Sequence, residues 1–510
     1  MMNFCSKYVI CFLFVIAPFL VFANHAHAAV QITVEEANDA PGLFDLFVKP
    51  YVKSLHHSFY VNSDEFLTQT GFYRLWEQRN GYLPNGKRLI VAQVETHHSD
   101  PKLFPGKLFI AHPVGAGVVG HTNTSGRIFY GNIPYSDKYA KFNYGFAPGI
   151  PVVHSFTSNA FRSEVLKLQP KQAQLRKPGL LPGFDIHLDV INISNTFGSA
   201  FHANTVRAMD YFIDKFNVVA CTSQPGNLSI NASASGVLWN SIVVGKAKTD
   251  LSYTGGTEAE NINGRKRPKP DIVSASHITG KGGGASSWTT PVVASGAAML
   301  LDYAKGDSAK VRARNSVVIK AIIMAGAQKT NLATPVYNDS GILIANTWDV
   351  PYVWKNSEDK PLDVNYGVGS FSIYNSMAIM DANEQVTGTD CAVTGWAYND
   401  VNDVDIDGYE FSVETASQEF SVVLTWNRKV TPDGDLEYSF TVADLSLSLE
   451  KMNSDGKYER VISSLDPGNN VEHIYLKNGL APGKYRLLVS SASASKTCYG
   501  LAWRSQINKE

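Results

Sequence analysis

The stretch "KGGGASSWTTPVVASGAAMLLDYA", from Lys281 to Ala304, decides the fold. It runs from glycines and serines through a Thr-Pro step into an apolar helical pattern with small residues on one face. Proline fits best at the first helical position, so we expect a helix beginning at Pro291. Ser287 then lies just before a helix N-terminus, where unpaired N–H groups and the positive dipole end can stabilise an oxyanion. An ordinary cap before a buried helix is the alternative for this stretch alone.

Short apolar runs precede and surround this segment. Runs of this kind are typical of buried parallel strands: "RLIVAQVE", "PVVHSF", "DVINIS", "NVVAC" and "SIVVGKA". Helical patterns lie between or after them, as in "HANTVRAMDYFIDKF" and "SVVIKAIIMAGA". Strands that alternate with helices predict an α/β fold, with a mainly parallel sheet covered by helices on both faces.

The pattern changes after about residue 385. Segments such as "EFSVVLTWN", "DLSLSLEKM" and "KYRLLVSSA" alternate apolar and polar residues and are separated by turn residues. This alternation predicts an all-β sandwich over residues 386–510. A chain of 510 residues suggests two or three domains, at roughly 150 residues each. We therefore assign an N-terminal extension to 29–80, with a short helix at "TGFYRLWEQRN", and the α/β domain to 81–385.

The N-terminus has the pattern of an export signal. Lys7 precedes the apolar run "YVICFLFVIAPFLVFA", and the small-residue motif "AHA" ends at Ala28. This order predicts a signal peptide over 1–28, cleaved after Ala28, and a secreted or periplasmic protein. A membrane anchor is the alternative, but Pro18 inside the run and the small-residue exit favour the signal peptide.

Three cysteines remain after the expected cleavage. Cys391 and Cys498 flank the strand-rich C-terminal region, and in an exported protein we expect them to form a disulfide. Cys221 lies in the apolar run "NVVAC". A small buried hydrophobe is the favoured interpretation there, ahead of a catalytic thiol.

Composition and charge exclude several classes of partner. Charged residues make up 18% of the chain and the formal net charge is −1, so neither nucleic acid nor an anionic membrane is an expected partner. No metal-ligand spacing stands out, and no cofactor is expected. The acidic run "DVNDVDIDG", from Asp400 to Gly408, is a candidate for calcium, but it lacks the spacing and terminal glutamate of an EF-hand loop, which favours a solvated turn.

The opening stretch resembles a known family block. "ASSWTTPVVASGAAML" resembles the serine block of the subtilases, G-T-S-M-A-T-P-H-V-A-G-A-A. Further segments resemble other subtilase blocks in the same order: "RLIVAQVETH", "GHTNTSGRIFYG", "GFAPGIPVV", "DVINISN", "VVACTSQPG", "SIVVGKAKTD", "KPDIVSAS" and "LDVNYGVGSFSIYNSMAIM". The resemblance covers about residues 85–385. It implies a subtilisin-like αβα peptidase domain acting on polypeptides.

The resemblance places three residues in a catalytic triad. Ser287 falls on the nucleophile, His121 on the base and Glu95 on the acid, where most subtilases have aspartate. A serine hydroxyl needs a base to take its proton, and a carboxylate behind the histidine fixes its tautomer. Asp100 is the alternative acid. Rival histidines near the same segment are His97, His98, His112 and His154.

Further site residues are implied by the same alignment. Gln224 falls where the family has its oxyanion-hole asparagine, and Asn227 is the alternative donor. Ser194, Asn195 and Thr196 fall on the edge strand that pairs with an extended substrate. Strand addition of this kind binds the substrate through main-chain hydrogen bonds.

The sequence thus predicts a secreted serine endopeptidase that works through an acyl-enzyme. A catalytically inactive subtilase fold used for binding is the alternative, because the departures from the family pattern gather at the site. A lipase-type esterase needs a G-x-S-x-G elbow, which the Ser287 segment lacks.

Overall fold

The structure is a computed structural model, and all the residues that it describes lie in one compact unit, Ser63–Glu510. It describes residues 67, 69–115, 117–131, 145–168, 187–195, 203–224, 235–246, 267, 269–275, 286–329, 333–337, 343–351, 353–433 and 437–506. The expected signal peptide lies outside these residues. Within them, every helix is too short or too polar to cross a bilayer.

A seven-stranded sheet forms the centre of the α/β domain, in the order β2-β3-β1-β4-β5-β6-β7. All its neighbouring strands pair in parallel. The strands are β1 (Ile90–Glu95), β2 (Leu108–His112), β3 (Val152–Thr157), β4 (Val190–Ile193), β5 (Val219–Ser223), β6 (Ile242–Lys246) and β7 (Ile272–Ser274). The five short apolar runs of the sequence form β1, β3, β4, β5 and β6, as predicted, whereas β2 and β7 were not predicted as strands.

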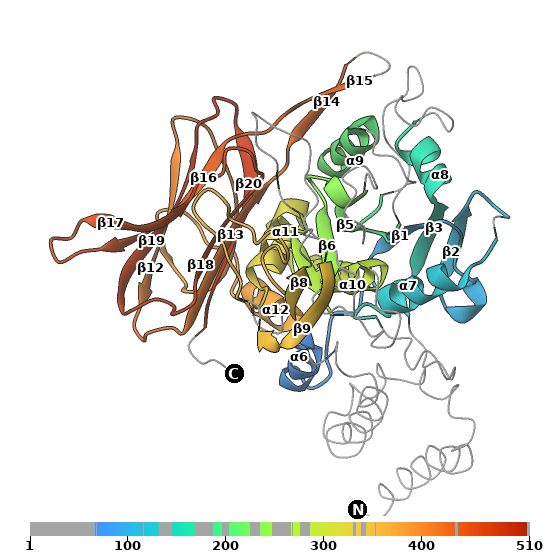
Figure 1. The fold of residues 1–510 in the computed structure, drawn as a ribbon, viewed down its shortest axis with the longest axis horizontal. Coiled ribbons are helices and arrows are strands. Elements are labelled where there is room, and N and C mark those ends of the chain that lie inside the picture. The colour runs from blue at the N-terminus through green and yellow to red at the C-terminus, as the bar shows by residue number, and fades with distance from the viewer. Residues whose placement is uncertain are drawn as a thin grey trace, which may run out of the picture. The chain divides into compact units, whose positions relative to one another are not determined.

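Helices cover both faces of this sheet (Figure 1). On one face, α9 (Ala203–Phe216) buries Met209 and Phe212 against inward side chains of β1, β3 and β4. On the other face lie α7 (Gly120–Tyr130) and α10 (Ser286–Gly306). Gln93 of β1 donates to the Thr122 carbonyl at 2.8 Å, which fixes α7 on that face. The αβα layering expected from the sequence is confirmed.

Helix α10 begins at Ser286, earlier than the predicted start at Pro291. Pro291 therefore lies inside the helix, and the Thr290 hydroxyl donates to the Ser286 carbonyl at 2.7 Å. Thr289 donates in turn to the Gly245 carbonyl of β6 at 2.8 Å. Hydroxyl contacts to the first turn and to the sheet thus extend the helix N-terminally, and Ser287 lies within its first turn.

The C-terminal region folds as two antiparallel sheets that share one apolar core, as the sequence predicts. One sheet has the order β10-β12-β19-β16-β17 and the other β11-β20-β13-β18. The strands are β10 (Asp390–Cys391), β11 (Gly395–Val401), β12 (Ile406–Val413), β13 (Glu419–Trp426), β16 (Leu445–Met452), β17 (Tyr458–Ser464), β18 (Val471–Leu476), β19 (Gly483–Ser491) and β20 (Thr497–Gln506).

The sandwich packs directly on the α/β domain. All ten residues of α11 (Ser316–Ala325) are buried, and the Thr425 hydroxyl of β13 donates to the Val317 carbonyl at 2.7 Å. A Cβ on Gly500 of β20 would lie 2.5 Å from that same carbonyl, so the close approach requires glycine. The hairpin of β14 (Lys429–Asp433) and β15 (Glu437–Thr441) extends over α9, where Tyr438 joins the core of the α/β domain (Figure 1).

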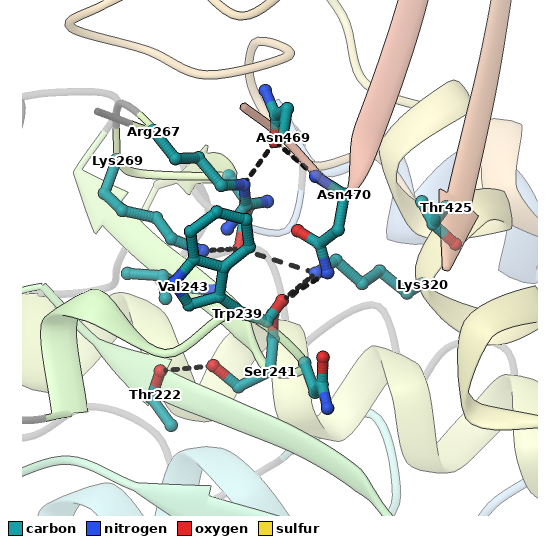
Figure 2. Close-up of polar contacts among 12 residues, drawn as sticks. Thr222, Trp239, Ser241, Val243, Arg267, Lys269, Lys320, Thr425, Asn469 and Asn470 are labelled. Carbon is teal, nitrogen blue, oxygen red and sulfur yellow. Dashed lines mark hydrogen bonds and ion pairs between the residues drawn. The ribbon is translucent and has the colours of Figure 1, made fainter. Parts of the chain in front are cut away.

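A buried ionic cluster lies between the two domains and comprises Arg267, Lys269, Asp271 and Lys320. Asp271 accepts from Arg267 and, at 2.9 Å, from the Lys269 ammonium, while the Lys320 ammonium lies 3.9 Å away. Arg267 also donates to Asn469 of the sandwich (Figure 2). The amide nitrogen of the adjacent Asn470 donates to the Trp239 carbonyl at 3.0 Å. Polar contacts therefore join the sandwich to the segment that leads into β7.

The expected disulfide is wrong. Cys391 lies on β10 of one sheet and is buried in the sandwich core, whereas Cys498 lies on β20 of the other sheet and is exposed; both are free thiols. Side chains alternate across a strand, and on β20 the neighbours Thr497 and Tyr499 point inward while Cys498 points outward. Cys221 is fully buried in β5, as expected of a small hydrophobe.

The N-terminal helix α6 (Phe72–Gln78) forms where the sequence predicts it. It precedes the predicted domain start at residue 81, yet it packs within the same compact unit. Phe72 stacks on Phe146 with ring centroids 4.8 Å apart, and the Ile373 N–H of α12 (Ile373–Asp381) donates to the Thr70 carbonyl at 2.9 Å. The α/β domain therefore includes the end of the N-terminal extension.

Candidate active site

Glu95 is the last residue of β1, at the carboxyl end of the central parallel sheet. Open parallel sheets place their functional sites at this edge. The Glu95 carboxylate is almost fully buried, with 1% of the side chain exposed. Burial raises the pKa of Glu95 above its ordinary value, although bonds to His121 and Ser125 act in the opposite direction.

His121 lies in the first turn of α7 and faces this carboxylate. Its Nδ1 is 3.3 Å from Oε2 of Glu95, and its side chain is 35% exposed. Burial lowers the pKa of His121, but the hydrogen bond and charge of Glu95 outweigh burial, so the pKa is raised. A carboxylate at Nδ1 leaves Nε2 of the imidazole as the proton acceptor, which is the arrangement of a general base.

A network of hydrogen bonds leads from the Glu95 carboxylate to Ser125, Gln93 and beyond. The Ser125 hydroxyl donates to Oε1 of Glu95 at 2.6 Å and accepts from Gln93 Nε2 at 2.8 Å. Gln93 Oε1 in turn accepts from the hydroxyls of Tyr130 and Ser99. Oε1 of Glu95 therefore contacts Ser125 and Oε2 contacts His121. The longer glutamate side chain thus contacts two residues of α7.

Ser287 is the second residue of α10 and is partly exposed. The next residue, Trp288, lies against His121 with ring centroids 4.4 Å apart and an angle of 37° between the planes. The first turns of α7 and α10 therefore meet beside the imidazole. Within the described residues, no hydrogen bond joins the Ser287 hydroxyl to His121, and in free enzymes such bonds often tighten only when substrate binds.

Gln224 follows β5 and is fully buried beside the start of α10. Its backbone carbonyl accepts from the Ser286 hydroxyl, while its Nε2 donates to the Lys269 carbonyl at 3.0 Å. One N–H of the Gln224 carboxamide thus binds the backbone of Lys269, a member of the buried ionic cluster. Gln224 lies next to the helix that bears Ser287, as the resemblance implies, but its side chain also has this structural contact. The alternative donor Asn227 lies outside the described residues.

The predicted substrate strand is described in part. Ser194 is buried and accepts from Asn192 Nδ2 at 2.9 Å. Asn195 donates to the Ser158 hydroxyl, which donates to the Glu95 carbonyl at 2.9 Å. The end of β4 is thereby linked to the backbone of Glu95, while Thr196 lies outside the described residues.

The alternative acid and the other histidines that the sequence offered for the site contact different residues. Asp100 caps a short helix by accepting from the Lys102 N–H at 3.0 Å. His98 contacts Ser155 and the Pro113 carbonyl, and His112 bridges His154 and Glu164. His97 contacts its neighbour Thr96 at 3.0 Å. Among the described residues, no group of three or more His, Cys, Asp or Glu side chains could hold a metal. This finding includes the acidic run from Asp400 to Gly408.

Two contributors to the site were missed from the sequence. Ser125 lies four residues after His121 on one helix, so the shared face was available as a signal. Trp288 follows Ser287 directly, but nothing local in the sequence indicates which side chain its indole contacts. That contact depends on α7, which lies more than a hundred residues earlier in the chain.

Comparisons with known proteins give structural neighbours only, since no family model and no curated protein matches this sequence. The prenylagaramide maturation protease PagA is 16% identical with a TM-score of 0.38, covering 60% of this chain and 98% of that one. Fervidolysin from Fervidobacterium pennivorans, described as a keratinolytic enzyme related to subtilisin, is 13% identical with a TM-score of 0.35, covering 80% of this chain and 60% of that one. The chain resembles the subtilases in its sequence motifs, and the solved structures to which it is similar include an enzyme described as related to subtilisin.

Proposed function

We propose that this protein is an exported serine endopeptidase of the subtilisin-like type. The observation that carries the proposal is the convergence of three segments at one imidazole. Glu95 lies at Nδ1 of His121, and the helix turn that bears Ser287 packs on the same ring through Trp288. In the proposed reaction, His121 takes the Ser287 proton as the hydroxyl attacks a peptide carbonyl, and then gives it to the leaving amine. Water hydrolyses the resulting acyl-enzyme by the reverse roles.

The proposed oxyanion site lies at the start of α10. The first backbone N–H groups of a helix have no intrahelical partner and point at a ligand placed before it. Gln224 remains the proposed side-chain donor, as the family resemblance implies. Loss of one oxyanion donor lowers turnover by roughly 10²–10³-fold, so Gln224→Ala measures its contribution.

A fluorophosphonate probe tests the nucleophile directly. The mature protein should be labelled at Ser287, and labelling should disappear in Ser287→Ala and fall sharply in His121→Ala. His97→Ala is the matched control, because this exposed histidine lies near the site and its imidazole contacts Thr96, while its carbonyl accepts from the Thr122 hydroxyl at 3.3 Å, a contact that alanine keeps. Labelling of the control at the wild-type rate would assign the base to His121.

A catalytically inactive binding protein is the second candidate. The contact of the Gln224 carboxamide with the Lys269 carbonyl favours it, because a donor with a structural partner is less available to an oxyanion. A folded mature protein that is not labelled, yet binds an extended polypeptide, would support this function instead.

A further inference from the structure

Trp288 is the one aromatic side chain that contacts the base within the described residues. The ring centroids of Trp288 and His121 are 4.4 Å apart, at the short end of the range of about 4.5–7 Å that is typical of aromatic pairs. The same distance lies inside the ~6 Å at which a cation over an indole is stabilised by the ring quadrupole. The indole therefore interacts with both the neutral and the protonated imidazole, and more strongly with the protonated form.

The position of His121 makes such a contact important. His121 lies in the first turn of α7, where the partial positive charge of the helix N-terminus disfavours an imidazolium. The Glu95 contact of 3.3 Å is longer than the 2.7–3.2 Å of a strong hydrogen bond, so it fixes the ring only loosely. A second contact is needed to restrict rotation of the ring and to stabilise its charge.

We propose that Trp288 is a positioning residue for the base: its indole holds the imidazole of His121 against Glu95 and stabilises the imidazolium that forms during proton transfer. This role rests on the proposed function, and it adds a residue that the serine block of the family does not supply. The block carries methionine at the corresponding place, and a thioether has no ring face to offer a cation.

Few other groups act on the imidazole. Besides the N-terminus of α7, the effects on His121 among the described residues are burial and the charge and hydrogen bond of Glu95 from β1. Ser125 of α7 and the Gln93–Tyr130 pair act only through Glu95. The helix α10 contributes the neutral indole. A change at Trp288 should therefore appear as a change in the titration of His121.

The experiment follows the His121 imidazole by NMR in the full mature protein with histidine-selective labelling and Ser287→Ala in every sample. Trp288→Leu should lower the His121 midpoint by roughly 0.4–0.7 pH units. Trp288→Phe should lower it less, because a phenyl face keeps part of the quadrupole. Trp354→Phe is the matched control, since Trp354 contacts a different histidine, His473, at 5.1 Å. An unchanged midpoint in a folded Trp288→Leu protein would overturn the proposal.

A second measurement keeps this inference separate from the proposed function. The pH dependence of fluorophosphonate labelling, measured with Ser287 intact, should show its acid limb shifted by the same amount in Trp288→Leu and in the Trp288→Met variant. A titration shift without any labelling would support the ring contact and refute the peptidase. Labelling with an acid limb identical to the wild type would support the peptidase and refute the role of Trp288.

Discussion

The substitution Asp271→Asn tests the polar junction between the α/β domain and the sandwich. The Asp271 carboxylate is fully buried and accepts from the Val243 N–H at 2.8 Å as well as from Arg267 and Lys269. Burial alone would raise the pKa of Asp271, but the charges of Arg267, Lys269 and Lys320 hold it far below its usual range. Asparagine keeps the shape of the side chain and removes the only negative charge of the buried ionic cluster.

The expected loss of unfolding free energy depends on the buried charges that remain after the substitution. Removing one partner of a buried ion pair costs about 3–5 kcal/mol, because the remaining charges stay buried without that partner. A typical unfolding free energy is about 5–15 kcal/mol, so Asp271→Asn should remove a large share of the stability. Urea unfolding followed by tryptophan fluorescence measures this as a lower midpoint.

Asp214→Asn is the matched control at the same junction between domains. Asp214 pairs with Lys429 at 2.9 Å, but 54% of the lysine side chain is exposed. An exposed pair contributes about 1 kcal/mol or less, so this variant should unfold close to the wild type. If Asp271→Asn and Asp214→Asn shifted the midpoint equally, the argument from buried charge would be refuted.

Three further changes test the site and the domain arrangement. Glu95→Asp shortens the acid by one methylene, so it should not reach both His121 and Ser125, and fluorophosphonate labelling should slow by roughly 10²-fold. Ser125→Ala keeps the Glu95–His121 contact and should slow labelling less than Glu95→Asp; an equal loss would show that Ser125 has another role. Deletion of 386–510 uncovers the apolar α11, so the shortened protein should be recovered mainly as aggregate, which soluble yield and light scattering would measure. Burial and the neighbouring His112 lower the pKa of His154 to about 4. An unfolded histidine titrates near 6.5, so the stability contributed by neutral His154 is present above that pH and is lost as pH falls toward 4. Urea unfolding between pH 7 and 5 should show a loss of at most about 1.4 kcal/mol per pH unit from this group, and His154→Asn should reduce the slope.

Much of the fold could be predicted because its signals are local. Short apolar runs such as "RLIVAQVE" have no solvated face, and this requires a strand covered on both sides. The same strand ends at Glu95, so the acid could be placed at the carboxyl edge of the sheet before any geometry was known. The alternation after residue 385 predicted a sandwich because each strand has one apolar face for the core and one polar face for solvent.

Other features depended on side chains that meet only in the folded chain. The sequence pattern predicted a bond between Cys391 and Cys498, but the two sheets present these residues on opposite sides. Helix α10 starts before the predicted Pro291, because the Thr289 hydroxyl contacts β6 and thereby supports an additional turn.

The amino-acid sequence by itself determined which residues carry the proposed chemistry: a carboxylate at a strand end, a histidine at the start of one helix and a serine at the start of another. Only the tertiary structure decided how these residues are supported. The Ser125 contact to Glu95, the indole of Trp288 on His121 and the Asn469 contact to Arg267 each join side chains from different elements. The physical reason is that periodicity reports the burial of one element at a time, whereas a contact between elements depends on how the whole chain packs.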